Sequence, residues 1–183
     1  MAKIAERISG NAAYELRAPL SREIGRILVH FAYFEQCVQE MVWQALKLSE
    51  AAGRIAVREP RVTDRLEMLR DAIKLRGGTF DEELYKSIYR RTNLLAAKRH
   101  LLAHGIWFHH KARGEWHVQL TRGSWPKNEE ELIAGSKKVT PESVVMTLEE
   151  LRSATSEISV LIADLKTLRR SAVEAAPSPQ TLP

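Results

Sequence analysis

The chain has 183 residues and a formal net charge of +5, with 44% hydrophobic residues, 28% charged residues and a single cysteine. These values predict one globular domain around one core, and the single cysteine excludes an internal disulfide or an all-cysteine metal site. The longest run without a formal charge covers residues 100–110, well short of the roughly 20 apolar residues that a membrane-spanning helix needs. We therefore expect no membrane span. Because the charged N-terminal segment lacks the apolar run of a secretory signal, we place the protein in the cytoplasm.

Helical periodicity dominates the sequence and predicts a mainly α fold. We expect an antiparallel four- to five-helix bundle with a β-hairpin inserted before the last long helix. Residues 1–18 form an N-terminal segment that supplies the extra helix. Residues 19–170 form the bundle, with the hairpin at about 106–120, and residues 171–183 form a disordered tail.

The first long helix is predicted at residues 19–48, where apolar residues recur at alternating steps of three and four. Glu35 falls where this stripe should continue with an apolar residue. The stripe consists of Ile24, Leu28, Phe31, Val38, Val42 and Ala45.

The second predicted helix covers residues 61–76 and is capped by Thr63 or Asp64. It stops at Gly77 and Gly78, because glycine readily takes the left-handed conformation that ends a helix.

The third and the last predicted helices begin with residues that favour a helix N-terminus. The third begins near Asp81, at the head of an acidic run, and should end at Gly105. The last runs from Thr140, a capping residue followed by Pro and Glu, to about Arg170.

Between these two helices the period changes to two, which predicts a β-hairpin. Its strands are residues 106–110 and 116–120, and Gly114 takes the positive φ of the turn. Residues 122–139 have no sustained period and predict a loop. One face of the hairpin should carry the apolar residues Ile106, Phe108, Trp116, Val118 and Leu120.

The end of the third helix concentrates polar residues in an apolar setting. On an ideal helix, Asn93, Ala97, His100 and His104 share one face, whereas Arg99 lies about 140° from His104. The simplest interpretation is that Arg99 and the histidines complement the negative end of the helix dipole.

A second interpretation is a metal site, since His100 and His104 have the spacing of the two histidines in H-E-x-x-H. The third ligand would then be one of the later histidines, His109, His110 or His117. However, Leu101 occupies the position of the general-base glutamate. We therefore assign no metal and no cofactor.

A third interpretation comes from a family resemblance. The segment from Arg99 to Gly105, RHLLAHG, resembles the R-x4–6-H signature of the HEPN superfamily (higher eukaryotes and prokaryotes nucleotide-binding). The continuation into Ile106 and Trp107 is similar to the H-G-x-W of many uncharacterised bacterial members. The setting is also similar, since the motif ends a bundle helix and the long first helix carries an acid, Glu35.

The resemblance implies a metal-independent endoribonuclease, in a toxin or phage-defence effector with RNA as substrate and, for a toxin, an antitoxin protein as partner. His104 would act as general base or acid, Arg99 would stabilise the phosphorane and His100 would orient the substrate. Arg99 and His104 can meet only if the last turn unwinds at Gly105 or if two subunits combine. The resemblance favours a cleft between the subunits of a homodimer. The alternative that stays open is a non-catalytic nucleotide- or protein-binding module.

Basic residues and two supporting residues complete the predicted site. Residues 61–113 hold 12 basic and 6 acidic residues, and Arg90, Arg91 and Lys98 could follow an RNA backbone, although exposed helix charges usually serve only solvation. Asn93 shares the face of the histidines.

Glu35 has two interpretations. A glutamate in an apolar stripe is costly unless it is paired, so burial against Arg91 or Arg99 is one. The other is that Glu35 orients Arg99 or His104 within the cleft.

Overall fold

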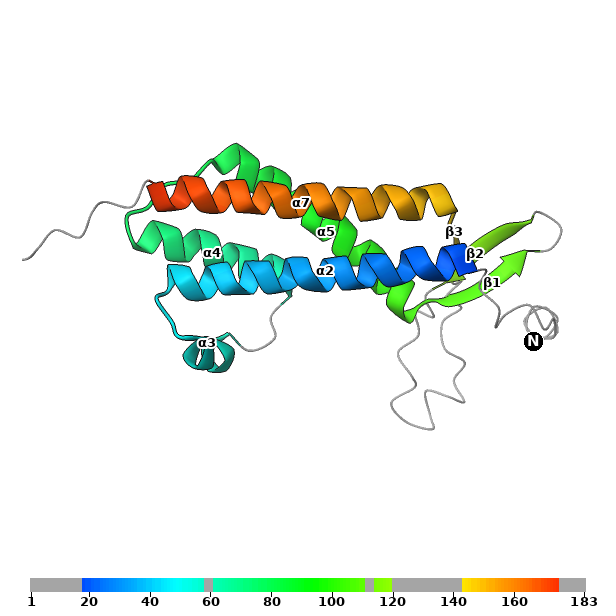
Figure 1. Ribbon diagram of the computed structural model, residues 1–183, viewed down its shortest axis with the longest axis horizontal. Coiled ribbons are helices and arrows are strands. Elements are labelled where there is room, and N and C mark those ends of the chain that lie inside the picture. Colours follow the sequence, from blue (N-terminus) through cyan, green and yellow to red (C-terminus); the bar gives the residue numbers. More distant parts are fainter. Residues whose placement is uncertain (1–17, 58–60, 111–113, 120–142, 175–183) are drawn as a thin grey trace, which may run out of the picture.

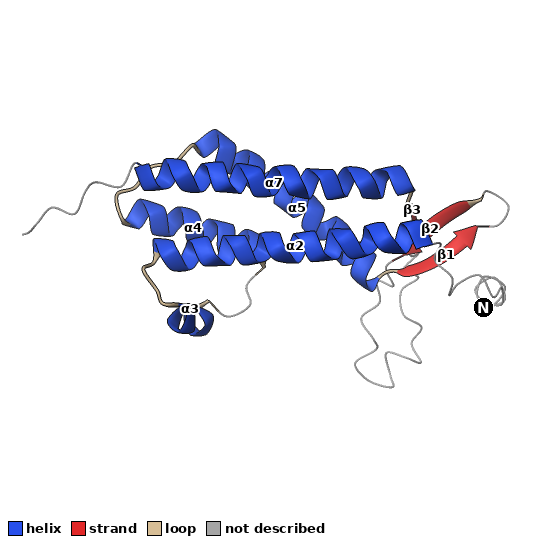
Figure 2. Ribbon diagram, in the orientation of Figure 1, coloured by secondary structure: helices blue, strands red, loops and turns tan. Residues whose placement is uncertain are grey.

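The computed structural model describes residues 18–57, 61–110, 114–119 and 143–174. Figure 1 shows their order: α2 (Ala18–Ala45), α3 (Glu50–Ala56), α4 (Val62–Leu75), α5 (Glu82–His104), β1 (Ile106–His110), β2 (Glu115–Gln119), β3 (Ser143–Val145) and α7 (Leu148–Glu174). The predicted mainly α fold, with strands inserted before the last long helix, is confirmed (Figure 2). The N-terminal segment, apart from Ala18, lies outside the described residues. Residues 171–174, predicted to belong to the disordered tail, continue helix α7 to Glu174, and the rest of the predicted tail lies outside the described residues. No helix in these ranges is long and apolar enough to span a membrane.

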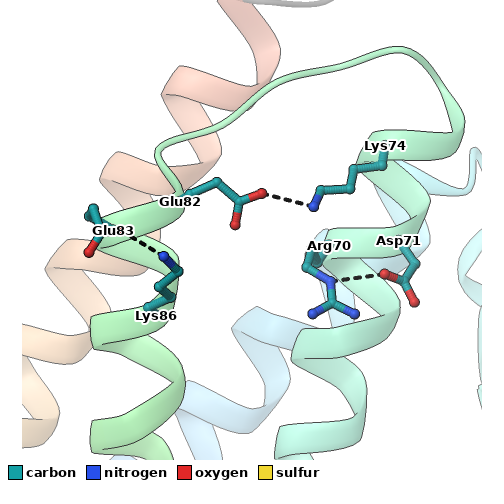
Figure 3. Close-up of polar contacts among 6 residues, drawn as sticks. All are labelled: Arg70, Asp71, Lys74, Glu82, Glu83 and Lys86. Atoms are coloured by element: carbon teal, nitrogen blue, oxygen red, sulfur yellow. Dashed lines mark hydrogen bonds and ion pairs between the residues drawn. The ribbon is translucent and has the colours of Figure 1, made fainter.

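The long helices pack side by side, with α5 antiparallel to α4 and α7. Lys74 of α4 and Glu82 of α5 form an ion pair of 2.8 Å between the end of one helix and the start of the next (Figure 3). α2 runs in the same direction as α7 (Figure 1), and Thr155 near the start of α7 lies 3.5 Å from Glu23 near the start of α2. The start of α2, the end of α5 and the start of α7 therefore gather at the sheet end of the bundle.

The core face of α2 differs in phase from the predicted stripe. Phe31 and Val38 are buried as predicted, but Ile24 and Leu28 are only half-buried, and their places are taken by Ile27 and other residues one position away. Most buried residues of α2 form two rows with a period of seven, and one row lies four positions after the other. Such rows are adjacent on the helix surface, so helices that pack on both sides of α2 can bury both rows. The buried residues of α2 are Leu20, Glu23, Ile27, Phe31, Phe34, Val38, Met41 and Val42.

Two helix ends follow the predicted chemistry, but α4 begins at Val62, before the predicted caps Thr63 and Asp64, and Asp64 instead accepts a hydrogen bond from the Arg61 N–H at 3.2 Å. The Asp81 carboxylate accepts a hydrogen bond from the Leu84 N–H at 2.9 Å and begins α5. Gly77, at φ +70°, ends α4 as predicted. The short α3 has no counterpart in the predicted elements, because seven residues are too few to display a helical period.

The three strands form an antiparallel sheet in the order β1-β2-β3, and Gly114 takes a positive φ of 66° in the hairpin turn as predicted. The predicted apolar face of the hairpin is wrong for β1. Trp107 pairs with Val118 in the register and both are buried, whereas Ile106 pairs with Gln119 and is 57% exposed. Since side chains alternate along a strand, burial of Trp107 turns Ile106 outward.

The last helix begins later than predicted. Thr140 lies outside the described residues, but Ser143–Val145 is strand β3, and α7 starts only at Leu148. The Thr147 hydroxyl accepts from the Glu150 N–H at 3.1 Å, and the Glu150 carboxylate accepts from the Thr147 N–H at 2.8 Å. This reciprocal capping box is the true start signal.

Candidate functional site

The end of α5 is a continuous helix held against the sheet. The Gly105 N–H donates to the Leu101 carbonyl at 2.8 Å, so the last turn does not unwind. α5 ends at Gly105 as predicted, with a φ of −78° and not the left-handed conformation that often ends a helix. A side chain here would collide with the Leu101 carbonyl and with Val118 of β2. Glycine is needed because helix and strand approach closely.

The histidines of the motif lie together on the outer face of this helix end. The ring centroids of His100 and His104 are 4.7 Å apart, with their planes inclined by 52°. Both residues are exposed, as are Asn93 and Ala97, so the four residues of the predicted face all point away from the core. The pair is open to a ligand or to another macromolecule.

Arg99 occupies a different side of α5. It is half-buried, and on an unbroken helix it stays about 140° from His104. Its side chain makes no hydrogen bond or ion pair with any other described residue. One chain therefore brings His100 and His104 together but leaves Arg99 on another side of the helix.

The three predicted RNA-binding residues have different surroundings. Arg90 is exposed, whereas Arg91 is half-buried and pairs with Glu157 at 2.7 Å and Asp164 at 2.8 Å on α7. Lys98 is also half-buried and faces the start of α7. The Thr147 backbone N–H is the main cause of a lowered pKa at Glu150, and the charge of Lys98 lowers that pKa further. Arg91 therefore joins α5 to α7 and is not free to meet a phosphate.

Glu35 lies in a separate place. It is half-buried and lines an open groove of about 740 Å³ along the second half of α2, together with side chains of α3 and α4. No described residue of α5 lines this groove, and Arg91, one of the two expected partners of Glu35, binds acids of α7 instead. The predicted pairing of Glu35 with an arginine of α5 is therefore wrong for Arg91. The reason is that Glu35 lies at the edge of the buried face of α2, on the side of α3 and α4. The groove is also lined by, among others, Gln36, Gln39, Trp43, Arg54 and Arg65.

The buried acid of α2 is Glu23, which sequence reasoning missed. It is only 6% exposed, accepts a hydrogen bond from Arg26 at 2.9 Å and lies 3.5 Å from the Thr155 hydroxyl of α7. Glu23 lies four residues before Ile27, so the two share one face of α2. The predicted stripe left out this face, and recognising Ile27 as a core residue would have pointed to Glu23. Glu23 thus joins α2 to α7 at the same end of the bundle as the histidines.

The described residues contain no group of three or more His, Cys, Asp or Glu side chains that could hold a metal ion. His109, one of the considered third ligands, contacts Trp116 with the ring centroids 5.1 Å apart and the planes inclined by 48°, and His117 is buried. No known family model, curated protein or solved structure matches the chain.

Proposed function

We propose that the protein is a HEPN-like, metal-independent endoribonuclease that acts as a homodimer in the cytoplasm, as a toxin or phage-defence effector. The observation that carries the proposal is the exposed pair of His100 and His104 at the rigid end of a bundle helix, with Arg99 one residue before the pair. Histidine is the side chain best suited to move protons near neutral pH, and a guanidinium is a permanent, planar phosphate ligand.

In the proposed reaction, the 2′-oxygen of the RNA attacks the adjacent phosphorus, and the 5′-oxygen of the next nucleotide leaves. His104 takes the proton from the 2′-hydroxyl or gives one to the leaving oxygen. Arg99 stabilises the extra negative charge on the phosphorane. His100 orients the substrate, and Asn93 lies on the same face.

The placement of Arg99 requires a second copy of the chain. Because α5 is unbroken up to Gly105, Arg99 and His104 of one copy face different ways. The outer face of α5 has the small Ala97 between its polar residues, which leaves room for a partner helix. Leu94 at its side is 68% exposed, and Ile106 just beyond is 57% exposed. A contact over these side chains leaves Arg99 on the far side of its own α5, so the proposal needs a second copy that reaches His104 with its Arg99 from outside this contact.

Arg90 and Lys98 are the basic residues of α5 that we propose for contacts with the RNA backbone. Phosphate contacts position the nucleic acid without reading its sequence. Arg91 supports them only indirectly, by holding α5 to α7.

A non-catalytic nucleotide- or protein-binding module is the second candidate, and the separation of Arg99 from His104 within one chain favours it. Incubation of the purified chain with labelled RNA in excess EDTA distinguishes the two functions. The nuclease predicts cleavage that His104→Ala and Arg99→Ala abolish, with helical content unchanged and with His30→Ala as an active control. Binding without cleavage would assign the module instead.

A further inference from the structure

His100 and His104 also have the geometry of a chelating pair. Residues four apart on a helix project side by side, and here both rings are exposed with centroids 4.7 Å apart. Because both side chains are exposed, each imidazole can turn a nitrogen toward one ion held between them. Imidazole nitrogen is a preferred ligand of Zn²⁺, Cu²⁺ and Ni²⁺.

The surroundings of the pair favour a cation. The histidines lie at the C-terminal end of the 23-residue helix α5, where the unpaired carbonyls give the helix a partial negative charge. The exposed neighbours on the same face are Asn93 and Ala97, which carry no charge. Lys98 and Arg99 leave the helix from other sides.

We infer that His100 and His104 together bind one divalent transition-metal ion of the imidazole-preferring class per chain. Since no larger ligand group exists within the described residues, water completes the coordination of the ion. Such a site differs from a closed structural zinc site and from a three-ligand catalytic centre. It therefore binds its ion reversibly.

Metal binding has a consequence for catalysis, and this consequence, unlike the metal site itself, rests on the proposed ribonuclease function. A metal-bound imidazole nitrogen can neither accept nor donate a proton. The ion thus inhibits RNA cleavage by blocking His104, so the enzyme is most active when such metals are scarce.

Calorimetric titration of the full chain with zinc chloride, in a buffer free of chelator, tests the site without any activity. Wild type should bind one ion per chain, and His100→Ala or His104→Ala should weaken that binding roughly a hundredfold, because each removes one arm of the chelate. His30→Ala, a histidine change on α2, is the matched control and should bind as wild type does. Equal affinity in wild type and in either α5 variant would overturn the site.

An RNA cleavage assay separates failure of this inference from failure of the proposed function. If the chain cleaves RNA in EDTA, zinc at a concentration that saturates the calorimetric site should stop cleavage, and added EDTA should restore it. Undiminished cleavage at that zinc concentration would overturn the inhibition. If the chain cleaves no RNA with or without EDTA, the proposed function fails, and the titration alone decides the metal site.

Discussion

Arg91 of α5 and Asp164 of α7 form a hydrogen-bonded ion pair of 2.8 Å, and the same guanidinium reaches Glu157 at 2.7 Å. The preceding residue, Arg90, is exposed, whereas the Arg91 side chain is only 20% accessible. Two adjacent arginines thus have different tasks. Arg91 holds two helices together, whereas the exposed Arg90 is the residue that we propose for contact with a phosphate.

The first prediction compares these neighbours. Arg91→Ala should lower the free energy of unfolding by about 2 kcal/mol, between the values for exposed and fully buried ion pairs, because it leaves two carboxylates without their partner. Arg90→Ala should change it by less than about 0.5 kcal/mol. Arg90→Ala should also weaken the dependence of RNA affinity on salt concentration, lowering the magnitude of the slope of log K against log[salt] by about one, the amount expected for one lost phosphate contact. Urea unfolding and RNA titrations at several salt concentrations measure both effects, and equal destabilisation by the two variants would contradict this assignment.

Gly105 provides a second test, with Gly25 as its control. Gly105→Ala should destabilise the protein by about 1–3 kcal/mol, because the new methyl group collides with the Leu101 carbonyl and Val118. A side chain at Gly25 meets nothing within 4 Å, and this residue lies inside α2. Gly25→Ala should therefore stabilise by up to about 1 kcal/mol. Thermal unfolding of both variants checks the opposite signs. A neutral Gly105→Ala would show that helix and strand are not closely packed.

Elements of this fold that depend on local chemistry could be predicted from the sequence. Asp81 and Gly77 mark helix ends because capping involves only a few neighbouring residues. The inward face of β1 and the phase of α2 depend on what packs against them, so Trp107 and Ile27 could not be recognised as core residues from spacing alone. Thr147 competes with Thr140 as a start signal, and the sequence does not rank the two.

In the candidate site, too, some features could be predicted from local sequence and others depend on which helices pack together. The common face of His100 and His104 follows from the 3.6-residue period. The place of Glu35 does not, since it depends on α3 and Arg65 lying over that side of α2. Burial of Glu23 depends on the contact between α2 and α7. This contact joins Glu23 to Thr155, which lies 132 positions later in the chain.

The capping box of α7 gives a third prediction, on pH. The Thr147 N–H holds the pKa of Glu150 below its usual value. A lowered folded-state pKa means that the contribution to stability is present above the ordinary glutamate pKa and is lost as the pH falls through the folded value. Glu150→Gln should therefore weaken the loss of stability on acidification, and Thr147→Ala should cost about 1 kcal/mol at neutral pH. Unfolding at pH 6 and pH 3 measures this. An identical acid response in wild type and Glu150→Gln would contradict it.

The two glutamates of α2 give a fourth prediction. Glu23→Ala should destabilise the protein by roughly 1–3 kcal/mol, because it removes a buried, charge-assisted hydrogen bond with Arg26 and the contact with Thr155. Glu35→Gln should leave stability and any RNA cleavage near wild type, because Glu35 lies in the groove away from the histidines. Loss of cleavage by folded Glu35→Gln would return this residue to the catalytic site.

The most direct test of the account is complementation between two inactive variants. In a symmetric dimer, a mixture of Arg99→Ala and His104→Ala chains forms heterodimers in which one of the two composite sites has both residues intact. The mixture should recover about a quarter of wild-type cleavage in EDTA, since about half of the dimers are mixed and each has one working site. Each variant alone should stay inactive. No recovery, although mass spectrometry confirms that the chains exchange, would contradict a site built from Arg99 of one copy and His104 of the other.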